Sequence, residues 1–100
     1  MKVTWTLFAR TQLKQISDYI KQTNPQNAQR WTQMILLKTR ILADQPEIGQ
    51  ISPLYIRPEI RELKLKNYRV IYRIDNATGI VYVLTIANDR EELNSDAIPL

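Results

Sequence analysis

The chain has 100 residues, and we expect residues 1–100 to form a single domain around one hydrophobic core. It contains no cysteine and no histidine, which excludes disulfides, thiolate nucleophiles, imidazole zinc ligands and serine–histidine–aspartate triads. We therefore expect no metal and no cofactor, and any acid–base catalysis would use Glu, Asp, Lys or Tyr. No apolar run is long enough for a signal peptide or a membrane span, so we expect a cytoplasmic protein.

The positive charge of the chain lies in one segment. Residues 57–73 carry six of the fourteen basic residues and two of the ten acidic ones, so their net charge of +4 equals that of the whole chain. Such a local excess attracts anionic partners, although a solvated polar face of a sheet would give the same pattern. The tail, residues 89–100, is acidic, and Arg90 is its only basic residue.

The first part of the chain changes from a strand pattern to a helix pattern. Apolar and polar residues alternate over residues 2–7, which predicts a first strand with one buried face. From Phe8 onward the apolar residues recur at helical spacing, and this predicts a first helix. Its apolar stripe consists of Ala9, Leu13, Ile16 and Ile20.

A second helix is predicted directly after the first. Asn24 is a suitable N-cap, and Pro25 fits the first helical position because its missing N–H costs nothing there. Met34, Leu37 and Ile41 widen the apolar face of this helix, so we expect it to be covered on two sides. The very short connection between the two helices predicts an antiparallel αα-hairpin.

Three strands are predicted after the irregular stretch 46–58. They are separated by turns at residues 66–67, where Asn67 tolerates a positive φ, and at residues 76–79. The last strand, residues 80–87, is apolar on both faces, which suits a central strand or one covered on both sides. The fold class is thus α+β: an N-terminal strand, an αα-hairpin and a three-stranded antiparallel meander with the helices on its apolar face.

The alternation also predicts a basic surface. Arg69 and Arg73 alternate with buried positions of their strand, and Lys64 and Lys66 do the same on the neighbouring strand. These four cations are therefore expected to share the open face of the sheet, opposite the helices. Two alternatives remain for Arg69, namely a cross-strand ion pair with Glu62 and cover by the C-terminal tail.

Two segments carry a resemblance to a known family. Residues 58–63 read Pro-Glu-Ile-Arg-Glu-Leu, and residues 68–73 read Tyr-Arg-Val-Ile-Tyr-Arg. Together with the Leu-x3-Pro-x2-Gly spacing at residues 42–49, they resemble the RelE/ParE superfamily of bacterial toxin–antitoxin toxins. The resemblance covers residues 1 to about 93 and implies a β-α-α-β-β-β fold.

The superfamily implies two different activities. RelE-like members are ribosome-dependent endoribonucleases that cut mRNA, whereas ParE-like members block DNA gyrase. In a nuclease the resemblance would assign catalysis to Arg61, Arg69 and Arg90. Leu63 occupies the place of a second lysine, however, and no aromatic residue follows Tyr82. The resemblance therefore favours a ParE-like gyrase inhibitor that is not an enzyme, with the mRNA endoribonuclease and an inactive binding module as alternatives.

The resemblance also implies partners. A cognate antitoxin would neutralise the toxin and would make the contact with operator DNA, while the toxin itself would cause growth arrest and plasmid stabilisation. No membrane partner is implied. The residues expected to bind the anionic target are Arg61, Lys64, Lys66, Arg69 and Arg73.

Overall fold

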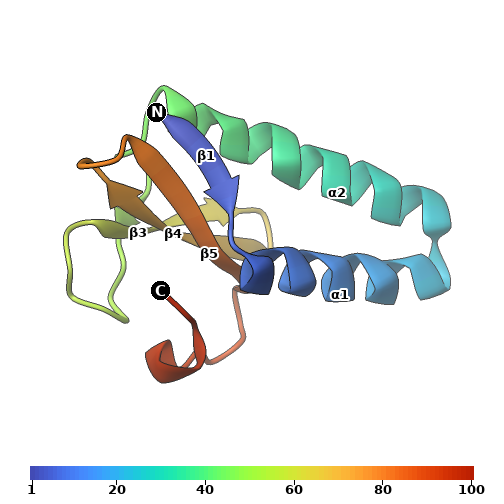
Figure 1. Ribbon diagram of the computed structural model, residues 1–100. Helices are drawn as coiled ribbons and strands as arrows, with labels where there is room; N and C mark the ends of the chain where they lie inside the picture. The colour runs from blue at the N-terminus through green and yellow to red at the C-terminus, as the bar shows by residue number, and fades with distance from the viewer.

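One five-stranded sheet and two long helices form the framework of residues 1–100, all of which the computed structural model describes (Figure 1). The strands lie in the order β1-β5-β4-β3-β2, with β1 parallel to β5 and every other pair antiparallel. The expected α+β class and the meander of β3, β4 and β5 are therefore confirmed. The strands span Lys2–Trp5 (β1), Gln50–Ile51 (β2), Ile60–Leu65 (β3), Tyr68–Asp75 (β4) and Ile80–Asn88 (β5).

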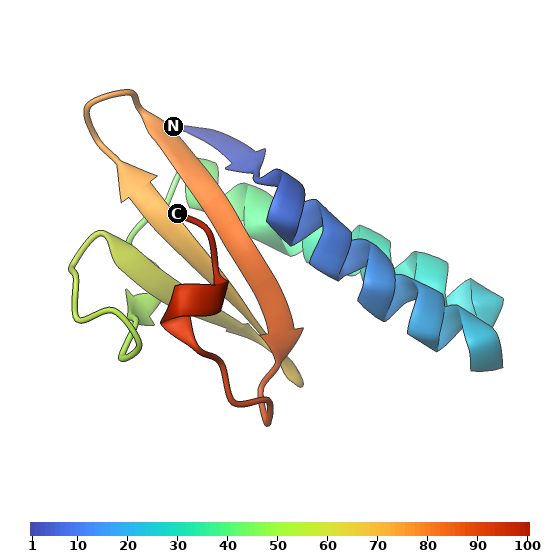
Figure 2. The same ribbon diagram turned by 60° about the horizontal axis from the view of Figure 1, so that its bottom comes forward.

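The two helices form the expected antiparallel hairpin, and both begin at a capped residue (Figures 1 and 2). The side chain of Thr6 accepts a hydrogen bond from the backbone N–H of Ala9 at 3.1 Å, and Asn24 accepts one from that of Asn27 at 3.0 Å. None of the helices combines the length and the apolar character that crossing a membrane requires. The helices span Leu7–Thr23 (α1) and Pro25–Thr39 (α2), and a short 3-10 helix, Arg40–Ala43, follows.

The helices cover one face of the sheet and bury the main core against it. Trp5 and Trp31 are partly buried and pack at the margin of this core. Leu42, in the 3-10 helix, packs on the same face against Tyr72 of β4. The buried residues at the centre of the layer are Ala9, Leu13, Ile35, Val70, Val83 and Ile86.

The expectation that α2 is covered on two sides is wrong. Ile35 is completely buried, but Leu37 is 64% exposed, and Leu36 and Ile41 are exposed as well. The sheet offers only one face to the hairpin, so α2 meets α1 and the sheet along one side and solvent along the other.

The opposite face of the sheet, which we expected to be open, is largely covered by the chain itself. The segment after β5 folds back across this face and contains a short 3-10 helix, Ser95–Ala97 (Figure 2). Ile98, which is 5% exposed, packs there against Ile60, Ile71 and Leu84. The tail is therefore part of the fold, and the cations of this face lie beside a second apolar layer.

Two local features of the second half depart from the expected pattern. β2 adds a two-residue strand to the edge of β3, within a stretch expected to be irregular. In the turn between β3 and β4 the positive φ falls on Lys66, at 55°, and not on Asn67. β3 consequently ends at Leu65, and Lys66 lies outside the ladder.

Candidate target-binding surface

Three of the predicted cations share the face of the sheet that lies away from the helices. Lys64 of β3 is directly opposite Arg69 of β4, and Arg73 follows further along β4. Lys64 is the most accessible of the three, since its side chain is 75% exposed. The role of these residues as target-binding groups remains a prediction.

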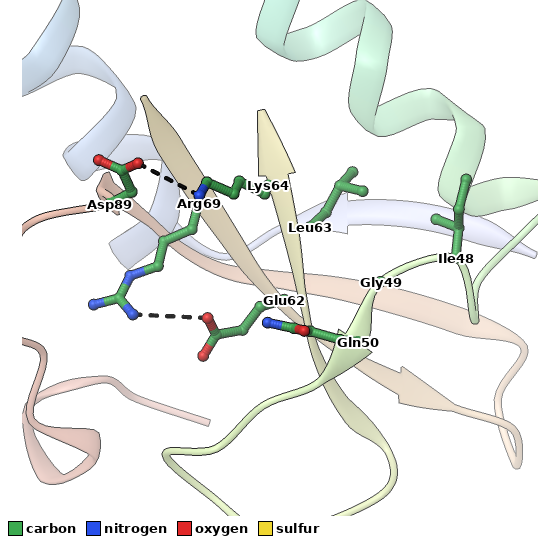
Figure 3. A pocket seen from close by; sticks show the side chains of 8 residues that line it. All are labelled: Ile48, Gly49, Gln50, Glu62, Leu63, Lys64, Arg69 and Asp89. Atoms are coloured by element: carbon green, nitrogen blue, oxygen red, sulfur yellow. Dashed lines mark ion pairs between the residues drawn. The ribbon is translucent and has the colours of Figure 1, made fainter. Parts of the chain in front are cut away.

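Arg69 is held by the protein rather than left free, as Figure 3 shows. One guanidinium nitrogen lies 3.7 Å from Oε1 of Glu62, and the other donates a hydrogen bond to the backbone oxygen of Glu91 at 2.6 Å. Asp89 lies 3.8 Å from the Lys64 ammonium group (Figure 3). Both alternatives considered for Arg69, the cross-strand pair and the covering tail, are thus present at once.

Arg73 has two partners of its own. Its guanidinium group lies 3.7 Å from the carboxylate of Asp75 and 4.8 Å from the centre of the Tyr82 ring, a distance at which a cation and an aromatic face attract each other. The side chain is 23% exposed, so it is less accessible to an anion than Lys64 is.

A buried carboxylate organises the centre of this face. Glu62 is 7% exposed and accepts a hydrogen bond from the hydroxyl of Ser52 at 2.7 Å, in addition to its contact with Arg69. Burial, and after it the charge of Glu62, raise the pKa of the Tyr55 hydroxyl above its ordinary value of 10.0. Nothing in the sequence indicated a role for Ser52. Its partner Glu62 is ten residues away, and the two become neighbours only because β2 pairs with β3.

A pocket of about 440 Å³ opens at the edge of β3, where the pairing with the short strand β2 stops (Figure 3). Both charge signs line it, so it is polar rather than purely cationic. The residues around it are Ile48, Gly49, Gln50, Glu62, Leu63, Lys64, Arg69 and Asp89. No cluster of three or more acidic, histidine or cysteine residues could hold a metal ion anywhere in the chain.

Arg61 does not belong to this surface, which corrects the expectation from the sequence. It lies between Ile60 and Glu62 on β3 and therefore points to the opposite side, where its guanidinium donates to the backbone oxygen of Gly49 at 2.8 Å. A longer contact of 3.4 Å reaches the backbone oxygen of Glu47. Arg61 thus fixes the loop before β2, and its role as a target-binding residue remains a prediction.

Lys66 and Arg90 also lie apart from the three shared cations. Lys66 leaves the ladder at the turn and lines a different pocket, beside α2. Arg90 is exposed just after β5, where its backbone N–H donates to the side chain of Asn88 at 3.0 Å. From the predicted set the structure therefore places Lys64 and Arg69 side by side and puts Arg73 on the same face further along β4.

Solved structures of toxin–antitoxin proteins share this fold. The chromosomal ParDE system from P. aeruginosa aligns with a TM-score of 0.69 at 22% identity, over 88% of this chain and 95% of that one. The isolated E. coli RelE toxin aligns with a TM-score of 0.64 at 17% identity, over 96% and 93%. The intact E. coli RelBE complex aligns with a TM-score of 0.63 at 14% identity, over 90% and 98%.

Comparison at the level of sequence families identifies one group. The family described as "ParE toxin of type II toxin-antitoxin system, parDE" matches residues 3–93, which includes both long helices and the whole sheet except the first residue of β1. No curated protein sequence matches the chain. Since the match covers nearly the whole chain and agrees with the fold, the chain belongs to the ParE toxin family of type II toxin–antitoxin systems.

Proposed function

We propose that this chain is a toxin that inhibits DNA gyrase, and that a cognate antitoxin neutralises it. Membership of the ParE family supports this function over mRNA cleavage. The observation that carries the proposal is the separation of the arginines that a nuclease would need, since Arg61 lies on the opposite side of the sheet from Arg69 and supports a loop. A binding surface does not require the convergence of groups on one phosphate that cleavage demands.

Within this proposal the exposed cations make the contact with the target. Lys64 carries the most accessible charge of the surface, and the side chain of Arg73 is partly exposed beside it on the same face. Arg69 serves a different purpose, because its contacts with Glu62 and the Glu91 backbone hold the tail in place. Substitution of Lys64 should therefore weaken target binding without unfolding the protein, whereas substitution of Arg69 should affect both.

A gyrase supercoiling assay with the purified chain tests the proposal. We expect concentration-dependent loss of supercoiling, and a weaker effect from Lys64→Gln. The matched control is Lys38→Gln, which removes the same charge from an exposed position of α2. Supercoiling that stays unaffected at saturating protein would exclude gyrase as the target. Codon-positioned cuts in primer extension on translated mRNA would instead support the nuclease.

The antitoxin part of the proposal has a separate test. An acidic antitoxin segment that orders on binding would find Lys64 and Arg73 on one face of the toxin. Co-purification of the chain with the product of a neighbouring reading frame, and growth arrest when the chain is expressed alone, are the expected results. The affinity should fall as salt is raised, because contacts between exposed charges are screened. Operator DNA would be bound through the antitoxin.

A further inference from the structure

A second pocket, of about 430 Å³, lies between α2 and the turn that joins β3 to β4. It shares no residue with the pocket of Figure 3 and has a different character. Aromatic, basic and carboxamide side chains line it, and no acidic residue does. These residues include Asn27, Arg30, Trp31, Lys66, Asn67 and Tyr68.

Two aromatic side chains form one wall of this pocket. The ring centres of Trp31 and Tyr68 are 5.0 Å apart, and the planes are inclined at 59°. Both rings pack against the main core on one side, which fixes their positions. The indole N–H of Trp31 is buried without a hydrogen-bond partner, which is uncommon in folded proteins. A fixed aromatic wall is a surface on which a planar ring can stack.

The charges of the pocket are uncompensated. Arg30 and Lys66 are both exposed, and neither takes part in any ion pair of the protein. The backbone N–H of Asn27 already donates to the Asn24 side chain at 3.0 Å, so the attraction for anions rests on side chains and not on the start of α2. Two cations without a counter-charge create a local positive potential.

The turn holds Lys66 and Asn67 at the mouth of the pocket. They are the two residues between the paired positions Leu65 and Tyr68, and the ladder closes directly on either side of them. Lys66 has a φ of 55°, a conformation that glycine or asparagine adopts more readily than lysine. The cation is thus carried by a short, defined turn and not by a mobile loop.

We propose that this pocket binds a nucleoside phosphate. The base would stack on one ring of the inclined pair Trp31 and Tyr68, the carboxamides of Asn27 and Asn67 would hydrogen-bond its edge, and Arg30 and Lys66 would hold the phosphate. An acidic peptide would satisfy the cations but leave the rings and carboxamides unused. The nucleotide can be free or an unpaired unit of a nucleic acid. The site is separate from the surface proposed for gyrase, so its failure leaves that proposal intact.

Nuclear magnetic resonance on the ¹⁵N-labelled full chain provides the test. The protein is titrated with adenosine monophosphate, with adenosine and ribose 5-phosphate as the two halves of that ligand, and with a short single-stranded oligothymidine. The nucleotide should shift the indole resonance of Trp31 and leave that of Trp5 unchanged. Each half should bind more weakly than the whole by about tenfold or more, since each forgoes one set of contacts. Tighter binding of the oligothymidine would identify a nucleic acid as the source.

Matched substitutions separate the pocket from general charge effects. Arg30→Gln and Lys66→Gln should each weaken binding by about fivefold, the upper range for contacts between exposed charges. Lys38→Gln, on the same helix but outside the pocket, should have no effect. The proposal is overturned if neither nucleotide nor oligothymidine shifts the Trp31 resonance, if Lys38→Gln weakens binding as much as Arg30→Gln, or if hexaglutamate binds these residues more tightly than the nucleotide.

Discussion

At the scale of single residues, Tyr72 and Arg61 determine the path of the loop before β2. The Tyr72 hydroxyl donates to the backbone oxygen of Pro46 at 2.6 Å and accepts from the N–H of Gly49 at 2.9 Å. Arg61 donates to the backbone oxygen of Gly49. Buried backbone groups are seldom left without partners, and here two side chains of the sheet supply them. The loop in turn lines the pocket at the edge of β3.

Glycine is needed at position 49 because there is no room for a side chain, and not because of its backbone angles. A Cβ atom there would lie 2.6 Å from the backbone oxygen of Glu62 and 2.7 Å from the Tyr72 hydroxyl. We expect Gly49→Ala to lower the free energy of unfolding by about 1–3 kcal/mol, the usual cost of overpacking. Urea denaturation measures the change, with Gln50→Ala at the exposed neighbouring position as control. Equal urea midpoints for Gly49→Ala and Gln50→Ala would contradict the close approach of Gly49 to Glu62 and Tyr72.

Tyr72 gives a prediction for alkaline pH. Burial raises the pKa of its hydroxyl above 10.0, so the unfolded chain releases this proton at a lower pH than the folded protein does. The resulting stabilisation is complete below pH 10.0 and is lost as the pH rises through the folded-state pKa. Tyr72→Phe should therefore show a shallower loss of stability with rising pH than the parent chain does. Denaturation midpoints across the alkaline range measure this slope, and identical slopes would contradict the assignment.

At the scale of elements, α2 shows how far apolar periodicity can be trusted. The pattern identifies the helix and its cap at Asn24. It does not distinguish an apolar side chain that meets the sheet from one that meets solvent, and Leu37 is exposed. Exposure of an apolar group depends on how many layers surround the helix, and that is a property of the whole assembly.

A matched pair of substitutions on α2 tests this assignment. Ile35→Ala should lower the free energy of unfolding by about 2–5 kcal/mol, because it leaves a cavity between the helix and the sheet. Leu37→Ala, two residues later, should change it by less than about 0.5 kcal/mol. Thermal or urea denaturation of the two variants measures the difference. Comparable losses would mean that the outer side of α2 is covered in solution.

The tail marks the limit of what the sequence reveals about the candidate site. Alternation along β4 correctly places Arg69 and Arg73 away from the helices. The same alternation puts Ile71 on that face, and an apolar residue between two arginines was a signal that something covers it. The cover comes from Ile98 of the C-terminal tail, which we considered from the sequence only as a cover for Arg69 and not as a partner of this apolar layer. The pairing of β2 with β3 could not be predicted either, because a strand of two residues is too short to show an alternation of apolar and polar residues.

At the scale of the whole molecule, the sheet joins segments from both halves of the chain. β1 pairs in parallel with β5, and Val3 and Trp5 add to the packing under the helices. β5 thereby becomes an inner strand, with β1 on one side and β4 on the other. This explains why residues 80–87 are apolar on both faces, as the sequence suggested.

Removal of residues 1–5 should expose the edge of β5 and the apolar groups beside it. We expect the shortened chain to lose cooperative unfolding and to associate, because unpaired strand edges are templates for pairing with other chains. Size-exclusion chromatography with urea denaturation measures both effects. Removal of residues 99–100, which are exposed and follow the buried Ile98, is the control. A monomer with an unchanged midpoint after the first deletion would show that β1 is dispensable.

The pairing of β1 with β5 also has a temporal consequence. During translation the first strand emerges with no partner, because the residues that pair with it, 80–83, are made near the end of synthesis. The nascent polypeptide therefore passes most of its synthesis as an unfinished protein. A product released early would lack β5, which lies between β1 and β4, so its first strand would have no partner and its sheet would stay incomplete.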